Sequence, residues 1–137
     1  MQKLIAAAVA AAAILRSDPV LVTRVSSGDA ITVASIGGVR LLGIEAAAPN
    51  ARERLESLVL LRWIRLEFDG EIGRAAKHRA YVMLETGEFV NATLVREGLA
   101  RVARHGGILR RTELERAEAE ARQFRRGIWA GYTRARP

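Results

Sequence analysis

The stretch VLVTRVSSGDAITVASIGGVRLLGI, residues 20–44, contains three short runs that are rich in β-branched residues. The runs cover residues 20–25, 31–36 and 39–44. Gly28-Asp29 separates the first run from the second, and Gly37-Gly38 separates the second from the third. Such dipeptides are typical of hairpin turns. The stretch therefore predicts a meander of three strands.

Further helices and strands follow the meander, and cap and turn residues mark their boundaries. Asn50 with Glu53 three residues later is a helix-start pattern, and we interpret Asn91 and Thr112 as the caps of two later helices. Glycines are the expected stops of these later helices. The predicted elements are a helix from Asn50, strands at 63–68 and 79–84, a short helix from Asn91 to Gly98, and a helix over 112–126.

The order of these elements predicts a mainly β fold with helices, of the α+β class. Five strands, a helix between the third and fourth, and helices at the end match the partly open Greek-key barrel called the OB-fold. We therefore expect a five-stranded OB-fold barrel with three helices. The chain has 137 residues, half of them apolar, which is enough for one core and one domain.

The composition indicates a polyanionic partner. The formal net charge is +7, and of the 22 basic residues only Lys3 and Lys77 are lysines. Guanidinium groups pair with phosphate in a bidentate way, although a coding bias toward arginine with a solvated basic surface also fits. The chain has no Cys, which excludes disulfides and thiolate metal sites.

The N-terminus predicts a hydrophobic leader over residues 1–15. Its apolar stretch at 4–15 has twelve residues, whereas a membrane span needs about 20. That length suits a signal peptide, and Ala11-Ala12-Ala13 offers a cleavage pattern. We expect a secreted or periplasmic monomer with a domain at 19–130, a basic tail at 131–137 and no stable membrane span in the mature domain. The alternative is an uncleaved helix that anchors the chain to a membrane or packs on the domain.

Four segments carry a family resemblance: Val25-Ser26-Ser27-Gly28-Asp29-Ala30, Val39-Arg40-Leu41-Leu42-Gly43-Ile44-Glu45, the run from Val90 to Ala100, and the run from Glu113 to Trp129. In this order and spacing they resemble the staphylococcal nuclease (thermonuclease) family. The resemblance implies hydrolysis of DNA and RNA phosphodiesters. It also implies a calcium ion, two arginines that stabilise the phosphate, and a glutamate that helps water attack.

The resemblance assigns part of that site to residues of this chain. Asp29 and Glu45 would supply carboxylates to calcium and Ala46 its backbone carbonyl, which are the oxygen ligands that a hard cation prefers. Arg40 matches the first phosphate arginine. The alternative for Asp29 is that Gly28-Asp29 serves only as a hairpin turn.

The second phosphate arginine has three candidates. Counting back from Ala80-Tyr81 selects Lys77, matching a Gly-Arg pair selects Arg74, and a shift of one residue selects Arg79. Lysine would be a weaker substitute, because it lacks the fork that clamps two phosphate oxygens.

The glutamate position has no counterpart. It falls on Ala48 without a gap, or on Asn50 if the proline is matched, and neither side chain accepts a proton from water. Losing a positioned general base costs about 10² to 10⁴ in rate. Glu53 lies one helical turn further and is a candidate substitute, although it also completes the helix start.

Two functions therefore remain open. One is a metal-dependent, calcium-type nuclease with a degenerate active site. The other is a barrel that has lost catalysis and binds nucleic acid or a protein, and an accessory structural role is a third reading. Because aromatic residues make up only 5% of the chain, we expect binding of DNA or RNA through phosphates, without sequence preference and with strong salt dependence.

Overall fold

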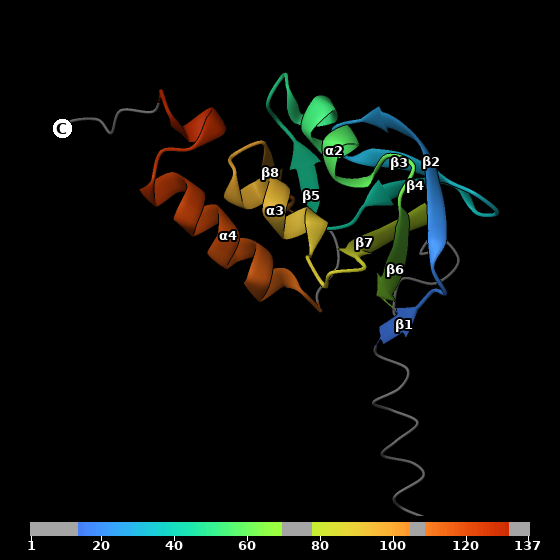
Figure 1. The fold of residues 1–137 in the computed structure, drawn as a ribbon. Helices are drawn as coiled ribbons and strands as arrows, with labels where there is room; N and C mark the ends of the chain where they lie inside the picture. Colours follow the sequence, from blue (N-terminus) through green and yellow to red (C-terminus); the bar gives the residue numbers. More distant parts are fainter. Residues whose placement is uncertain (1–13, 70–77, 105–108, 132–137) are drawn as a thin grey trace, which may run out of the picture.

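The computed structural model describes residues 14–69, 78–104 and 109–131 (Figure 1). Arg74, Lys77, most of the predicted leader and most of the basic tail lie outside these ranges. The strands are β1 (Ile14–Arg16), β2 (Val20–Ser27), β3 (Ala30–Val33), β4 (Gly37–Leu41), β5 (Ile44–Ala46), β6 (Trp63–Asp69), β7 (Arg79–Leu84) and β8 (Ala100–Val102). The helices are α2 (Ala51–Val59), α3 (Val90–Arg96) and α4 (Arg111–Gln123), and Gly127–Trp129 forms a 3-10 turn, η2.

Strands β2, β3, β4, β7 and β6 form a closed five-stranded barrel, because β6 pairs with both β2 and β7. All neighbouring strands are antiparallel except β4 and β7, which run parallel. β1 extends the edge of β6, and β5 pairs with β8 in a separate two-stranded sheet. The predicted OB-fold barrel with three helices is therefore confirmed.

The barrel is filled by the apolar residues that alternate along its strands. Val22, Val25, Ile31, Val33 and Val39 are all at most 2% exposed. Helix α2 lies across one end of the barrel and α3 and α4 lie together beside it (Figure 1). Burial of these β-branched residues on one face of each strand is what the sequence pattern predicts.

Two details of the predicted meander are wrong. The turn after β3 lies at residues 34–36 and not at the glycines, because Ser35 takes the positive φ of 72° and Gly37 already pairs with Val33. The predicted strand at 39–44 is also divided. Leu42 and Gly43 form a turn, with a φ of 82° at Gly43, so that β4 stays in the barrel and β5 leaves it.

Asn91 is not the helix cap that the sequence predicts. The cap position of α3 is Phe89, and Asn91 lies inside the helix with none of its surface exposed. Its side-chain oxygen accepts the N–H of Val82 at 2.9 Å, and its amide donates to the carbonyl of Leu42 at 2.8 Å. Asn91 therefore joins β7 to the residue at which the chain leaves β4.

Helix α4 starts at Arg111 with Arg110 at its cap position, so Thr112 is not the helix cap that the sequence predicts. An arginine anchors this helix start instead. Arg110 donates to Glu67 at 2.7 Å and to Glu113 at 2.6 Å, and Glu67 is only 3% exposed. The hydrogen bond to Glu67 is the main cause that raises the pKa of Arg110 above its usual value.

The C-terminal end of α4 is fixed by two glycines that lie back to back. Gly98 and Gly127 both have positive φ, and a β-carbon on either would collide with the backbone of the other segment. The N–H of Ile128 also donates to the carbonyl of Gly98 at 2.8 Å. The contact explains why both glycines are present, since only glycine allows this approach.

Over the described ranges, no helix combines the length and the apolar character that crossing a membrane requires.

We expect Asn91→Ala to lower the free energy of unfolding by about 3 kcal/mol, because it leaves buried backbone groups of Val82 and Leu42 without partners. Asn50→Ala is the matched control. Asn50 occupies the cap position of α2 without a side-chain hydrogen bond, so its loss should change stability by less than about 0.5 kcal/mol. Urea unfolding of both variants measures the difference, and equal effects would contradict the structural part assigned to Asn91.

Candidate functional site

The β2–β3 turn brings Asp29 against two other segments. A β-carbon on Gly28 would lie 2.7 Å from the β-carbons of both Ala46 and Ala51, so only glycine lets the turn approach β5 and α2 this closely. The carbonyl of Asp29 accepts the N–H of Leu41 at 2.8 Å, which fixes the turn to β4 as well. The Gly28-Asp29 turn is therefore a packing contact in addition to a hairpin connection.

Asp29 is 9% exposed, and its carboxylate accepts three hydrogen bonds. Its Oδ2 accepts the N–H of Ala46 at 2.9 Å. Its Oδ1 accepts the hydroxyl of Ser27 at 3.0 Å and a guanidinium N–H of Arg40 at 3.1 Å. These bonds hold the carboxylate in one orientation, beside the point where β5 leaves the barrel.

Arg40 and Arg79, named here the pocket arginines, project from the two parallel strands that close the barrel. They are direct partners in the β4–β7 register. The side chain of Arg40 is 60% exposed, and Arg79 is also exposed. Neighbouring residues of paired strands lie about 5 Å apart, so the register places two positive side chains next to each other.

The Leu42–Gly43 turn forms the floor of a pocket with a volume of about 250 Å³. The N–H of Ala103 donates to the carbonyl of Gly43, and a β-carbon on Gly43 would lie 2.7 Å from Leu114 of α4. The pocket is lined by Asp29, Arg40, Leu41, Leu42, Gly43, Ile44, Glu45, Arg79 and Ala103. It therefore combines two arginines with two carboxylates.

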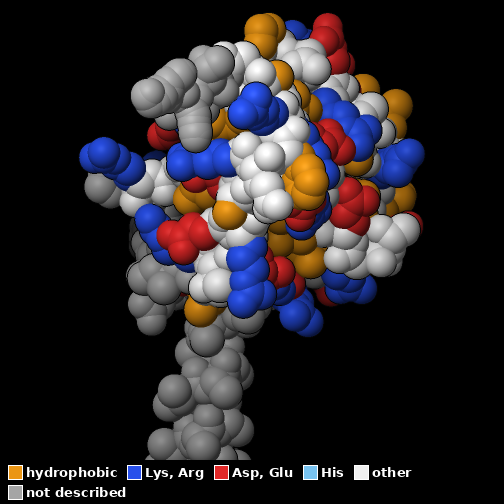
Figure 2. All heavy atoms as spheres, turned by 90° about the vertical axis from the view of Figure 1, so that its left-hand side faces the viewer, with side chains coloured by type: hydrophobic (Ala, Val, Ile, Leu, Met, Phe, Trp, Pro, Cys, Tyr) orange, Lys and Arg blue, Asp and Glu red, His pale blue; other side chains and the backbone are white. Residues whose placement is uncertain are grey.

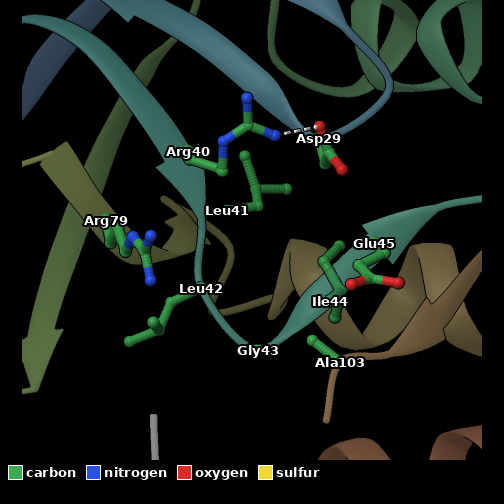
Figure 3. Close-up of a pocket in the computed structure, with 9 residues that line it drawn as sticks. All are labelled: Asp29, Arg40, Leu41, Leu42, Gly43, Ile44, Glu45, Arg79 and Ala103. Atoms are coloured by element: carbon green, nitrogen blue, oxygen red, sulfur yellow. Dashed lines mark hydrogen bonds and ion pairs between the residues drawn. The ribbon is translucent and has the colours of Figure 1, made fainter. Parts of the chain in front are cut away.

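The polar side chains of the pocket point in different directions (Figure 3). Arg40 points toward Asp29, whereas Arg79 and Glu45 stand on opposite sides of the Leu42–Gly43 turn. Glu45 is exposed, and its carboxylate makes no hydrogen bond or ion pair with another described residue. Its carboxylate is available to a ligand without breaking an existing contact.

Asp29, Arg40 and Glu45, which the sequence predicts as site residues, all line this pocket, and Asp29 and Arg40 are in contact. Of the three candidates for the second arginine, Arg79 lines the pocket, while Arg74 and Lys77 lie outside the described residues. Ala46 lies beside the pocket and contacts Asp29 through its N–H.

The positions considered for a general base do not line the pocket. Ala48 is half-buried, and Asn50 and Glu53 are exposed at the start of α2. Among the described residues, Asp29 and Glu45 are the only carboxylates in the lining, and Asp29 already accepts three hydrogen bonds.

Two residues that position the site were missed by the sequence analysis. Ser27 donates to Asp29 and accepts the N–H of Asp29 at 3.3 Å. A serine two residues before the aspartate of a turn is a recognised turn pattern and could have been found. Asn91 had no comparable signal, because its partners come from β7 and from the turn that follows β4.

A family model described as staphylococcal nuclease homologue matches residues 39–131. The match covers more than half of the chain, from β4 through η2, and includes the pocket arginines and Glu45. Asp29 precedes the matched segment, and its place at the pocket comes from the structure alone. No curated protein was found to match the chain.

We expect Gly28→Ala to destabilise the fold by about 1–3 kcal/mol, because the new methyl group would overlap Ala46 and Ala51. Gly38→Ala is the control, since nothing lies within 4 Å of its added β-carbon. Chemical unfolding of the two variants tests the close approach of the Asp29 turn. The same loss in both would contradict it.

Proposed function

Because the chain belongs to the staphylococcal nuclease homologue family, we propose that it hydrolyses phosphodiester bonds of DNA or RNA at the pocket between β4, β5 and β7. Family membership supports a nuclease-like fold. We propose in addition that catalysis depends on a metal ion such as calcium, and that the active site lacks the general-base glutamate.

The observation that carries the proposal is the register of the pocket arginines beside two carboxylates. Negative charge builds on the non-bridging oxygens of a phosphodiester as water attacks, so cations fixed beforehand near these oxygens lower the barrier. Two guanidinium groups from adjacent strands offer several N–H donors to one phosphate group. The open side of the pocket gives a polynucleotide access to them.

Asp29 positions one of the pocket arginines. Its Oδ1 holds one guanidinium N–H of Arg40, which leaves the other donors of that group free for phosphate. The hydrogen bonds from Ser27 and Ala46 keep Asp29 itself in place. The guanidinium therefore needs little reorganisation when phosphate binds, which is the condition for effective electrostatic stabilisation.

The donor set of the pocket fits a hard cation that is held together with the substrate. Asp29 and Glu45 would supply carboxylate oxygens and Ala46 its carbonyl, and calcium takes six to eight oxygen ligands in all. No three acidic or histidine side chains in the described ranges gather into a metal site. Phosphate oxygens and water would therefore have to complete the set. A bound cation would supply further positive charge to the phosphate.

The pocket lacks a side chain with the clear geometry of a general base. Ala48 cannot accept a proton, and Glu53 does not line the pocket. We therefore propose a slow enzyme, with a rate about 10² to 10⁴ below that of a site with a positioned base.

A binding module without catalysis is the second candidate, and the hydrogen bonds of Asp29 favour it. An aspartate that already accepts three hydrogen bonds, one from an arginine, has less capacity for a metal ion. Such a module would bind phosphate groups through the pocket arginines. It would bind DNA or RNA without sequence preference.

We also propose export of the protein. The predicted leader of residues 1–15 overlaps β1, whose Ile14 and Leu15 pair with β6. A cut after Ala13 would leave this strand intact, so the small-residue pattern at 11–13 is the proposed cleavage site.

The test is cleavage of denatured DNA and of RNA by the full chain, with calcium and with chelator. We expect chelator-sensitive cutting that Asp29→Asn and Arg40→Gln each reduce by about 10² to 10³, since each change removes charge stabilisation or its support. Arg116→Gln is the control, because Arg116 lies on α4 away from the pocket.

Cutting that persists with chelator and in both pocket variants would contradict the proposed site. Binding of the same DNA or RNA strands without cleavage would favour the binding module.

A further inference from the structure

Most arginines of the helices are neutralised by glutamates. Figure 2 shows the face on which α4 lies, where basic and acidic side chains alternate over the surface. The ion pairs with helix arginines are Arg52–Glu56, Arg54–Glu97, Arg96–Glu120, Arg111–Glu115 and Arg122–Glu118. The helices therefore offer few unpaired positive charges to a polyanion.

The barrel strands next to the pocket have the opposite character. Strands β2, β3, β4 and β7 contain Arg24, Arg40 and Arg79 and no Asp or Glu. Asp29, in the turn between β2 and β3, is paired with Arg40. Arg24 is exposed, and its guanidinium makes no hydrogen bond or ion pair with another described residue.

The strand register places Arg24 on the same outer face as the pocket arginines. Arg24 pairs with Thr32, and Thr32 pairs with Gly38 of β4. The neighbouring row runs from Ala30 to Arg40 and on to Arg79. Because Val25, Ile31 and Val39 on the same strands point into the core, these two rows face outward.

Only small side chains lie between Arg24 and Arg40 on this face. The residues that separate Arg24 from Arg40 on this face are Thr32, Gly38 and Ala30, and none has a large side chain. Two interstrand steps of about 4.8 Å and one two-residue step of about 6.8 Å place Arg24 roughly 12 Å from Arg40, a separation that spans more than a single phosphate group.

We infer that Arg24 forms a second phosphate-binding point, outside the pocket, for a single polynucleotide strand that crosses the outer face of β2, β3 and β4. The strand would lie over Thr32 and Gly38, with one phosphate at the pocket arginines and another at Arg24. This inference rests on the proposed binding of nucleic acid at the pocket. It adds the path that the strand follows from there.

The experiment measures binding by the full chain in chelator, so that no cleavage occurs. The ligands are a dinucleotide with one phosphodiester, followed by NMR titration, and a labelled single-stranded 15-mer, followed by fluorescence anisotropy at several salt concentrations. The variants are Arg24→Gln and the control Arg116→Gln. Each must keep the melting temperature of the unchanged chain.

We expect Arg24→Gln to weaken binding of the 15-mer about fivefold at 0.1 M salt and to reduce the slope of log K against log salt by about 0.7, the value for one phosphate on a single strand. Binding of the dinucleotide should not change, and Arg116→Gln should alter neither ligand.

An unchanged slope for Arg24→Gln, or equal effects of both variants, would overturn the inference while leaving the pocket proposal intact. Failure of the unchanged chain to bind the 15-mer at all would overturn the proposed nucleic-acid binding as well.

Discussion

The arrangement of the pocket depends on one buried amide, the side chain of Asn91. Strand β4 pairs with β7 through Arg40 and Arg79 and one further residue pair, and then the chain turns away. Beyond this point the side chain of Asn91 supplies hydrogen-bond partners in place of β4. It accepts the N–H of Val82 and donates to the carbonyl of Leu42. Without it, buried backbone groups would lack partners at a cost of about 1–3 kcal/mol each. The register of the pocket arginines and the start of β5 are both fixed at this point.

Close glycine contacts hold the helices to this framework. Gly43 accommodates Leu114 of α4 at the turn between β4 and β5, and Gly98 meets Gly127 where α4 ends. Gly28 lets the Asp29 turn reach β5 and α2. Each of these contacts joins segments distant in sequence at a point where a side chain would collide. Each of the four segments that carry the family resemblance therefore contributes a close packing contact.

The sequence predicted the fold well where the signal is local. Strand 79–84 and the barrel order follow from alternation and turn residues, which depend on neighbours in the chain. Asn91 was misread as a cap because its partners lie far away in the sequence. Strand 39–44 is divided at Gly43, where the positive φ and the close approach of Leu114 both require glycine. In the site, Arg40 and Asp29 were selected by motif, whereas only the β4–β7 register brings Arg79 into the pocket.

The charges on the helices are mostly paired, whereas β2, β4 and β7 carry Arg24, Arg40 and Arg79 without any Asp or Glu. This arrangement gives the barrel a face suited to a polyanion. We propose that the pocket arginines bind the same phosphate. A crystal structure of the full chain with a single-stranded oligonucleotide and calcium would show whether they do. We expect one phosphate within hydrogen-bond distance of both Arg40 and Arg79, with density for a cation between Asp29 and Glu45. An oligonucleotide bound on another face, with the pocket left unoccupied, would contradict it.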